Sequence, residues 1–505
     1  MSKRMWVAAA VTALAVLLTG CSGQSDTPTD EKTVLTTAQA SPPMSLDPYL
    51  SEGGGYYPYL SPIYDSLILW TADGQFAPGL ATEWSYSADA LSFTMKLREG
   101  VTFSDGAAFN AEVAKANLDR AATVTGPRTA QLAPVTSITV DDEYVVTLHL
   151  ASPLPSLETL LADVLGMMVS PNSLADPNAN PIGTGPYVLN MAETILDDSY
   201  KFELRSDYWD AGHYHFAEYV VRVIPDSNTM YQALKAGEID YMGAQPSQAT
   251  QATADGFQVV RSPVNFAAVF LYDRGGTMVP ALGDVRVRQA LNYAVDREAI
   301  MQAAAAGYGT VTSQLVPPGI EGHVDALDTY YTYDPEKAKT LLAEAGYADG
   351  FTLKVTAAAF LNGLVPAQLF SSYLAAIGVT VEIDEAQPAD FIPAMLSGST
   401  PAAQFLWGLQ DVYLDSYNLT DPSGAFNPFS CDDDEINDLI ARAAVATPEE
   451  RVKLYQQWNE TVVSKGWFVI THFQDLVIIA SDSITDVSWW PARATASIRD
   501  WKPKA

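Results

Sequence analysis

Two short stretches of the chain combine residue types that commonly bind metal ions. His213 and His215 flank a tyrosine, and four acidic residues at 432–435 follow Cys431. Histidine suits zinc, and carboxylates suit calcium. The histidines lie in a polar stretch typical of a loop, whereas the acids lack the glycine and spacing of a calcium loop and immediately precede a helical pattern. We interpret the first stretch as a solvated loop and the second as a helix cap, and we predict no metal site and no cofactor.

Motifs for nucleotide binding and common hydrolytic chemistry are missing from the sequence. There is no GxxxxGK[ST] or GxGxxG, no GxSxG and no HExxH. This pattern favours a binding protein over an enzyme. Paired carboxylates of a glycosidase can lie far apart in sequence, so an enzyme stays open as an alternative.

The amino terminus carries an export signal. Lys3 and Arg4 precede an apolar run from Val7 to Leu18, which is too short to span a membrane and typical of a signal peptide over residues 1–20. The following LTGC resembles the lipobox of bacterial lipoproteins, which implies acylation of Cys21 and a flexible stalk over 21–32. The alternative is an ordinary cleaved signal with a chance cysteine.

Composition limits the class of protein further. The net charge is −32, which makes nucleic acid an unsuitable partner and keeps a protein soluble outside the cell. Hydrophobic residues make up 48% and charged residues 17% of the chain, as in a globular protein. Beyond Cys21 the only cysteine is Cys431, so we expect no internal disulfide.

Strand patterns recur along the chain. Apolar residues alternate over 91–97, and residues 137–150 indicate two strands around a turn at Asp141–Asp142. Alternation also occurs over 351–355 and 379–383, and the helical pattern between them, 364–377, predicts a βαβ unit with parallel strands.

Helix ends are marked by capping residues. Asp334, followed by Pro335, predicts a helix that ends at Gly346. Thr447 and Glu450 have the spacing of a capping box. Helices and strands therefore alternate, which predicts a mixed α/β architecture.

Several ordered stretches share a pattern with one known family. They are SLDP (45–48), residues 64–120, PIGTGPYVL (181–189), SDYWD (206–210), and residues 220–242, 284–300, 333–347 and 370–383. Together they cover nearly all of the mature chain and resemble the large extracytoplasmic solute-binding proteins of ABC importers, in the group that takes dipeptides, oligopeptides and nickel.

The resemblance implies an α/β, two-lobed periplasmic-binding-protein-like fold with an extra domain inserted in the N-terminal lobe. Ligand would be enclosed between the lobes by hinge closure. The expected division is lobe I over 33–55, 185–265 and 475–505, the inserted domain over 56–184, and lobe II over 266–474.

The resemblance also implies a function. We expect a lipid-anchored, monomeric carrier on the outer face of the cytoplasmic membrane, which captures peptides and delivers them to ABC permease subunits. Two alternatives stay open: the same carrier role for an oligosaccharide or chelated nickel, and a surface sensor or enzyme on the same fold.

One stretch is similar to the family's ammonium-binding segment, W-x-x-D-Y-P-D-P. In FLWGLQDVYLDSYNL, Trp407 and Asp411 correspond, with one extra residue between them. The prolines are missing, and Asp415, which is also a candidate for ligand contact, is displaced by one position. The resemblance implies that Asp411 pairs with a ligand ammonium group and that Trp407 supplies apolar area. Alternatively, Asp411 is a solvated loop residue.

Three further residues are candidates for ligand contact. Tyr56 and Tyr57 follow three glycines, which let the backbone approach a ligand. Asn265 begins a segment, 265–272, that resembles the family's lobe-crossing strand. For all three residues, a packing role is the alternative.

Overall fold

The computed structural model describes residues 32–504, except 53, 72–73, 410 and 489–495. The predicted signal peptide, Cys21 and most of the stalk therefore lie outside the described residues. Within the described part of the chain, no helix combines the length and the apolar character that crossing a bilayer requires.

The largest sheet in the described residues has the strand order β15-β14-β16-β12-β17-β11-β1-β10-β9-β8, and β13 pairs with β17. Its strands are β1 (Val34–Gln39), β8 (Tyr187–Leu189), β9 (Ser199–Leu204), β10 (Glu218–Val223), β11 (Tyr241–Ala244), β12 (Gln258–Leu271), β13 (Gly309–Val311), β14 (Thr352–Ala357), β15 (Thr380–Glu385), β16 (Ala402–Gly408) and β17 (Phe468–Ala480). We call β1 and β8–β11 its first half and β13–β16 its second half.

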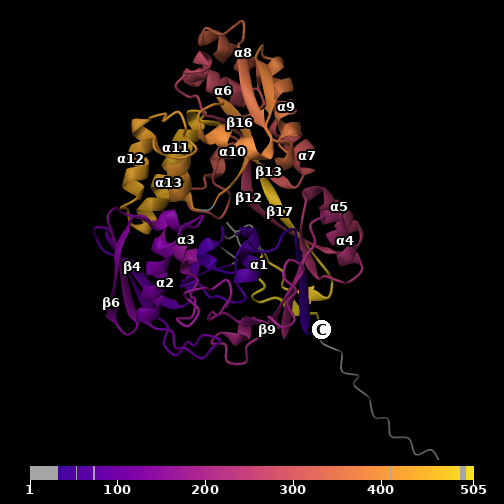
Figure 1. Ribbon diagram of the computed structural model, residues 1–505. Helices are drawn as coiled ribbons and strands as arrows, with labels where there is room; N and C mark the ends of the chain where they lie inside the picture. Colours follow the sequence, from indigo (N-terminus) through magenta and orange to yellow (C-terminus); the bar gives the residue numbers. More distant parts are fainter. Residues whose placement is uncertain (1–31, 53, 72–73, 410, 489–495, 505) are drawn as a thin grey trace, which may run out of the picture. The chain divides into compact units, whose positions relative to one another are not determined.

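Two long strands, β12 and β17, join the halves (Figure 1). Their antiparallel pairing runs from Gln258 opposite Ala480 to Phe270 opposite Phe468. The register shifts between Pro263 and Asn265, near the middle of the pair. Proline has no N–H to donate to a ladder, so the regular pairing is interrupted where one half passes into the other.

Helices cover both faces of the second half. On β12, Val269 and Leu271 face a core shared with α6–α9, whereas Phe266, Ala268 and Phe270 face a core shared with α10–α13. This alternation follows from the two-residue period of a strand. The helices are α6 (Val285–Tyr293), α7 (Arg297–Ala305), α8 (Pro335–Glu344), α9 (Leu364–Ala375), α10 (Pro388–Leu396), α11 (Val412–Thr420), α12 (Asp434–Ala443) and α13 (Pro448–Ser464).

The first half packs α4 (Ser227–Lys235) and α5 (Pro246–Ala254) on one face, through a core that includes Ala38, Met242 and Ile479. Its opposite face joins a larger core shared with residues 56–184. Near the carboxyl terminus, Trp501 is buried in that core and its ring lies 4.7 Å from the ring of Tyr241.

Residues 56–184 contain a sheet of their own, with the strand order β4-β5-β7-β6. Helix α2 packs against β6 and β7 of this sheet. The elements of this part and of the carboxyl terminus are α1 (Tyr57–Leu60), β2 (Ile68–Trp70), β3 (Phe76–Pro78), β4 (Ala81–Tyr86), β5 (Ser92–Leu97), α2 (Ala111–Thr123), β6 (Val135–Asp142), β7 (Val145–Leu150), α3 (Leu157–Leu161), β18 (Ile484–Thr485) and β19 (Lys502–Pro503).

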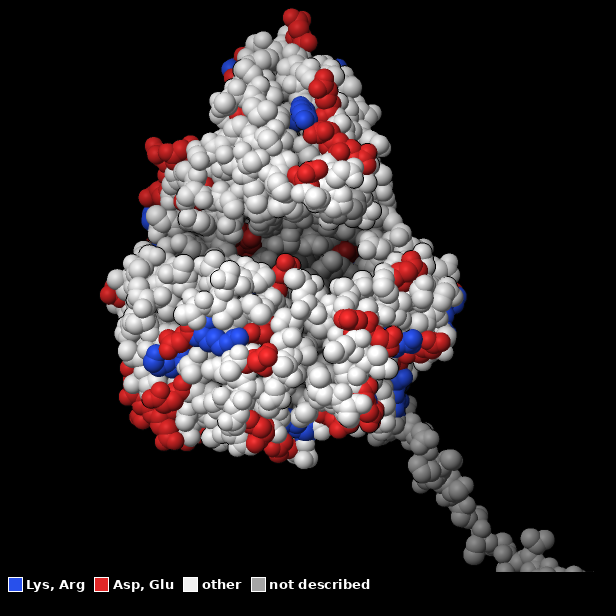
Figure 2. All heavy atoms as spheres, in the orientation of Figure 1, with Lys and Arg blue, Asp and Glu red and all other residues white. Residues whose placement is uncertain are grey.

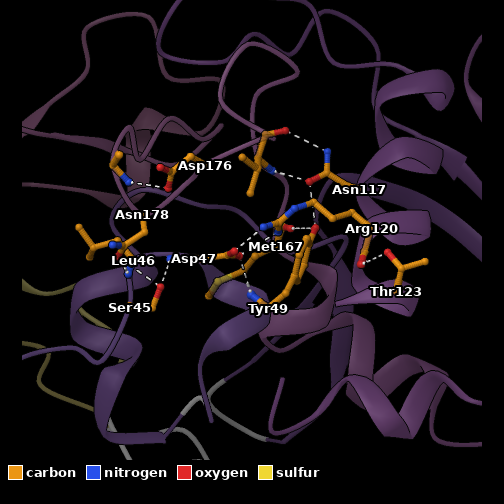
Figure 3. Close-up of polar contacts among 12 residues, drawn as sticks. Ser45, Leu46, Asp47, Tyr49, Asn117, Arg120, Thr123, Met167, Asp176 and Asn178 are labelled. Atoms are coloured by element: carbon orange, nitrogen blue, oxygen red, sulfur yellow. Dashed lines mark hydrogen bonds and ion pairs between the residues drawn. The ribbon is translucent and has the colours of Figure 1, made fainter. Parts of the chain in front are cut away.

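A buried polar network ties the segment after β1 to α2 (Figure 3). Both guanidinium ends of Arg120 donate to the carboxylate of Asp47, which also caps the short turn Pro48–Leu50. The hydroxyl of Tyr49 donates to the Asn117 side chain at 2.9 Å. Asp47 belongs to the SLDP stretch, so this part of the family-like pattern has a structural role.

Most local predictions are confirmed. The predicted βαβ unit is β14-α9-β15, whose strands pair in parallel. Asp334 accepts the N–H of Lys337 and Thr447 accepts that of Glu450, so both cap helices as expected. Asp433 likewise caps α12, as the interpretation of the acidic run requires.

The turn predicted at Asp141–Asp142 is wrong. Both residues belong to β6, and the connection to β7 is formed by Glu143 and Tyr144. The hydroxyl of Thr147 donates to the Asp141 carboxylate at 2.6 Å, so a cross-strand partner stabilises this aspartate within the strand.

Candidate functional site

A hollow of about 300 Å³ lies on the sheet at the junction of its halves. Its floor is formed by neighbouring residues of three strands: Asn265 lies opposite Gln474, and Ala267 lies between Leu406 and His472. Residues paired in register project from the same face of a sheet, and the small side chain of Ala267 leaves space between larger neighbours. We call this hollow, lined by Asn265, Gln404, His472 and Gln474 around Ala267, the amide pocket.

The walls of the amide pocket come from both halves of the sheet. Gln245 and Pro246, at the start of α5, approach from the first half. Ala304 near the end of α7 and residues 361–363 before α9 approach from the second half. A group bound here would therefore contact both halves at once.

The polar side chains of the amide pocket have unused hydrogen-bonding capacity. Gln404 is only 6% exposed, yet no described residue hydrogen-bonds to its side-chain amide. The same holds, within the described part of the chain, for the half-buried amides of Asn265 and Gln474. Buried amides in folded proteins are almost always paired, so this cluster calls for an explanation.

His472 adds a ring nitrogen to this cluster. The residue is fully buried, its Nδ1 lies 2.9 Å from the hydroxyl of Thr471, and its Nε2 has no hydrogen-bond partner among the described residues. Burial lowers the pKa of His472 to about 4. The imidazole is therefore neutral at pH 7.

One charged side chain described by the structure lines the amide pocket. Asp475 is buried at its edge and accepts from the Arg261 guanidinium. Burial raises the pKa of Asp475, and the charge of Arg261 opposes that rise. The edge of the pocket thus carries a paired carboxylate.

A second cavity, of about 380 Å³, lies between α3 and the starts of α11 and α13. Asp411, Glu158, Glu321 and Arg451 line it, together with the Phe76 ring and other residues. We call it the acidic pocket, defined by these four charged residues. Acidic side chains are also visible inside a hollow on the face shown in Figure 2.

The carboxylates of the acidic pocket are paired. Asp411 accepts the hydroxyls of Ser156 at 2.8 Å and Thr159 at 2.6 Å, and it caps α11 through the N–H of Leu414. The Arg451 guanidinium lies 3.9 Å from Glu158 and 3.6 Å from Glu321.

Burial is also the main influence on the two glutamates. It raises the pKa of both Glu158 and Glu321, and the negative charge of Asp411 adds to that rise. Three carboxylates and one guanidinium line this pocket, an excess of negative charge that suits a cationic group.

The predicted residues Trp407, Asp411 and Asp415 lie together. The indole N–H of Trp407 donates to Asp415 at 3.0 Å, and the backbone N–H of Asp411 donates to the same carboxylate at 3.1 Å. Asp415 is 3% exposed and the Trp407 ring packs on Phe426. Asp415 and Trp407 therefore fix the connection between β16 and α11, while Asp411 lines the acidic pocket.

The other predicted residues are distributed elsewhere. Asn265 lines the amide pocket. Tyr57 is buried in the core that the first half of the sheet shares with residues 56–184, and Tyr56 packs against that core. Neither tyrosine lines the amide or the acidic pocket. Ligand contact by the two tyrosines stays a prediction, and Cys21 lies outside the described residues.

Sequence reasoning missed most of the amide pocket and the partners of Asp411. A signal for the pocket was present: in FVITHFQDLVIIA, four polar residues, Thr471, His472, Gln474 and Asp475, interrupt a strand that is otherwise apolar. For metals, no group of three or more possible ligands occurs among the described residues.

Known proteins resemble this chain along most of its length. Residues 75–428 match the family described as bacterial extracellular solute-binding proteins, family 5 Middle. The glutathione-binding protein GsiB of Salmonella typhimurium is 29% identical over 467 residues, covering 87% of this chain and 89% of that protein.

Solved structures share the fold. The PBP AgaA from A. tumefaciens R10, in complex with agropinic acid, is 26% identical with a TM-score of 0.75, over 94% of this chain and 99% of that chain. DppA from Helicobacter pylori, in complex with peptide STSA, is 22% identical with a TM-score of 0.73 over the same shares. The predicted α/β, two-lobed fold class is confirmed.

Proposed function

The chain belongs to the bacterial extracellular solute-binding proteins of family 5, which serve ABC importers, and we propose that the solute it captures is a peptide. The relative named for binding glutathione, a tripeptide, supports this ligand class. We propose a carrier role only, with no catalytic step, in which a monomer delivers its ligand to permease subunits in the membrane.

We propose that the two lobes divide as the sequence predicts: lobe I over 33–55, 185–265 and 475–505, lobe II over 266–474, and the inserted domain over 56–184. The register shift beside Pro263, where the chain passes from the first to the second half of the sheet, supports a hinge at this boundary. The separate sheet β4-β5-β7-β6 supports the inserted domain. Hinges in such proteins are a few residues that absorb backbone changes between rigid bodies.

The observation that carries the peptide proposal is the acidic pocket. Asp411 lines a cavity in which two further carboxylates face a single guanidinium. An ammonium group placed there would donate a charge-assisted hydrogen bond and would be attracted by the excess negative charge of the pocket. We propose that the amino terminus of the peptide binds beside Asp411, with Trp407 and Asp415 holding that residue in place.

We also propose that Cys21 is acylated, so that the folded body is held at the outer face of the cytoplasmic membrane. The LTGC sequence after the apolar run supports this. Cells expressing the chain would be labelled with radioactive palmitate. The wild-type protein should incorporate label, and Cys21→Ser should not; equal labelling would contradict the proposal.

A second ligand class has support of its own. The 26% identical structure in complex with agropinic acid shows that a protein of this fold takes a ligand other than a simple peptide. The uncharged polar lining of the amide pocket is compatible with such a solute. The carrier role is the same in either case.

Isothermal titration tests the peptide proposal. The full chain, purified in detergent, would be titrated with trialanine and with N-acetyl-trialanine, which lacks the ammonium. Trialanine should bind and the acetylated peptide should bind at least ten-fold more weakly. Asp411→Asn should remove most of this difference, whereas Asp390→Asn, at an exposed position on α10, should leave it unchanged. Equal binding of the two peptides would contradict the proposal.

A further inference from the structure

We propose that the amide pocket binds an uncharged, hydrogen-bonding part of the ligand, a primary amide or neighbouring hydroxyl groups, and disfavours a free carboxylate. This inference rests on the proposed carrier function and names the chemistry at the second end of its ligand. It concerns Asn265, Gln404, His472 and Gln474, none of which belongs to the acidic pocket.

The first support is the set of unpaired groups. The Nε2 atom of His472 is buried and the Gln404 side chain is 6% exposed, and neither has a hydrogen-bond partner among the described residues. A buried polar group without a partner destabilises a fold, so it persists where a ligand or water completes it. A cavity of about 300 Å³ in contact with these groups has room for part of a small solute.

The second support is the spacing of these groups. Asn265 and Gln474 are directly opposed across β12 and β17, and Gln404 comes from the neighbouring strand β16. Opposed side chains in an antiparallel pair begin about 5 Å apart. Each amide offers both a donor and an acceptor, which suits amides and hydroxyl groups because these also donate and accept.

The third support is charge. His472 is neutral at pH 7 because it is buried, so it offers no positive charge. The described charged residue of the lining, Asp475, is acidic and already bound by Arg261. No described residue of the lining is cationic, so a ligand carboxylate would lose its water there without gaining a charged partner, whereas an uncharged amide or hydroxyl group would not.

Paired ligands test the inference. The full chain in detergent would be titrated with trialanine and trialanine amide, and with gluconate and gluconamide. In each pair that binds, the uncharged member should bind at least ten-fold tighter than its carboxylate partner. Tighter binding of the carboxylates, or no binding by either uncharged member, would overturn the inference.

The same experiment separates this inference from the peptide proposal. Preference for trialanine amide over trialanine supports both. Tighter binding of gluconamide than of gluconate, with no binding of either peptide, supports the amide pocket and contradicts the peptide ligand. Binding of trialanine with preference over its amide supports the peptide ligand and contradicts the amide pocket.

Variants locate the effect in the pocket. Ala267→Leu should fill the hollow and weaken the uncharged ligand at least ten-fold, and Gln404→Leu should weaken it about ten-fold. Gln232→Leu, on the exposed face of α4, is the matched control and should bind normally. If Ala267→Leu fails to fold, Asn265→Leu, at a half-buried position, replaces it and should also weaken binding of the uncharged ligand. Normal binding by the folded pocket variants would overturn the inference.

The sharpest test is a variant that should change which ligand the pocket prefers. Gln404→Arg places a positive charge at the amide pocket and should shift the preference from trialanine amide toward trialanine, by at least ten-fold in the ratio of their affinities. Thermal melting without ligand verifies that the variant is folded. An unchanged ratio in the folded variant would contradict the placement of the ligand.

Discussion

Polar side chains line both pockets, but they are paired differently. In the acidic pocket, Asp411 accepts hydrogen bonds from Ser156 and Thr159, and Arg451 lies between two glutamates. In the amide pocket, Gln404 and Nε2 of His472 have no partner among the described residues. The acidic pocket is therefore largely satisfied by the protein itself, and the amide pocket is completed by something bound to it.

Because of this difference, we expect the acidic pocket to contribute to the stability of the fold and the amide pocket to contribute to the choice of ligand. Removing one member of a paired, buried set leaves its partners unsatisfied and destabilises the fold. Removing an unpaired polar group does not. Variants in the acidic pocket should therefore change the free energy of unfolding without ligand, and variants in the amide pocket should mainly change ligand choice.

The largest effect is expected for Arg451→Met. The guanidinium is largely buried, and its loss leaves the mostly buried Glu158 and the 46% exposed Glu321 with excess negative charge near Asp411. The free energy of unfolding should fall by about 4 kcal/mol, measured by urea denaturation. Arg442→Met, at an exposed pair on α12, is the control and should cost less than about 1 kcal/mol. Equal effects would remove the distinction between the pockets.

A pH effect of about 3 kcal/mol is expected from His472 in the amide pocket. Its pKa is about 4 in the folded protein, against an ordinary value of 6.5. Between these values the unfolded chain binds a proton and the folded protein does not, so stability falls as pH falls from 6.5 to 4.

His472→Gln should remove this dependence. Buried carboxyls such as Asp65, whose pKa burial raises to about 6, titrate in the same range in both proteins. The test is therefore the difference between wild type and variant in urea denaturation at pH 4.5 and 7. A difference independent of pH would contradict the neutral, buried imidazole.

An intermediate effect is expected for Asp411→Asn without ligand. The variant keeps one side-chain oxygen as an acceptor but loses the charge that strengthens the bonds from Ser156 and Thr159. The free energy of unfolding should fall by about 2 kcal/mol. An unchanged midpoint in urea would show that these hydroxyl contacts contribute nothing to stability.

The smallest effect, with the opposite sign, is expected for Gln404→Leu without ligand. Replacing this unpaired amide, on a side chain that is 6% exposed, by an apolar side chain of similar size should leave stability unchanged or raise it by about 1 kcal/mol. Thermal melting of the ligand-free protein gives the sign. Clear destabilisation would show that Gln404 is satisfied within the fold, and would weaken the comparison.

Local structure was predictable from sequence, and the pockets were not. Asp334 and Thr447 cap helices because capping depends on residues three positions apart. The turn predicted at Asp141–Asp142 was misplaced because Thr147, on the partner strand, stabilises Asp141. The amide pocket depends on the register of β12, β16 and β17, which lie far apart in the chain.

For Asp411, too, the local position could be predicted from the sequence but the contacts with distant residues could not. Its position beside Trp407 could be inferred from the similarity to the family's segment, and it does line a cavity. Its hydrogen bonds to Ser156 and Thr159 join residues more than 250 positions apart, so they could not be predicted from the spacing of residues in the sequence.

The most direct test is a crystal structure of the protein with the tightest-binding member of the peptide and sugar pairs. We predict an uncharged amide or hydroxyl group within hydrogen-bond distance of Gln404 and His472, and for a peptide an ammonium group beside Asp411. A carboxylate bound in the amide pocket, or a ligand that leaves the pocket to water alone, would contradict it.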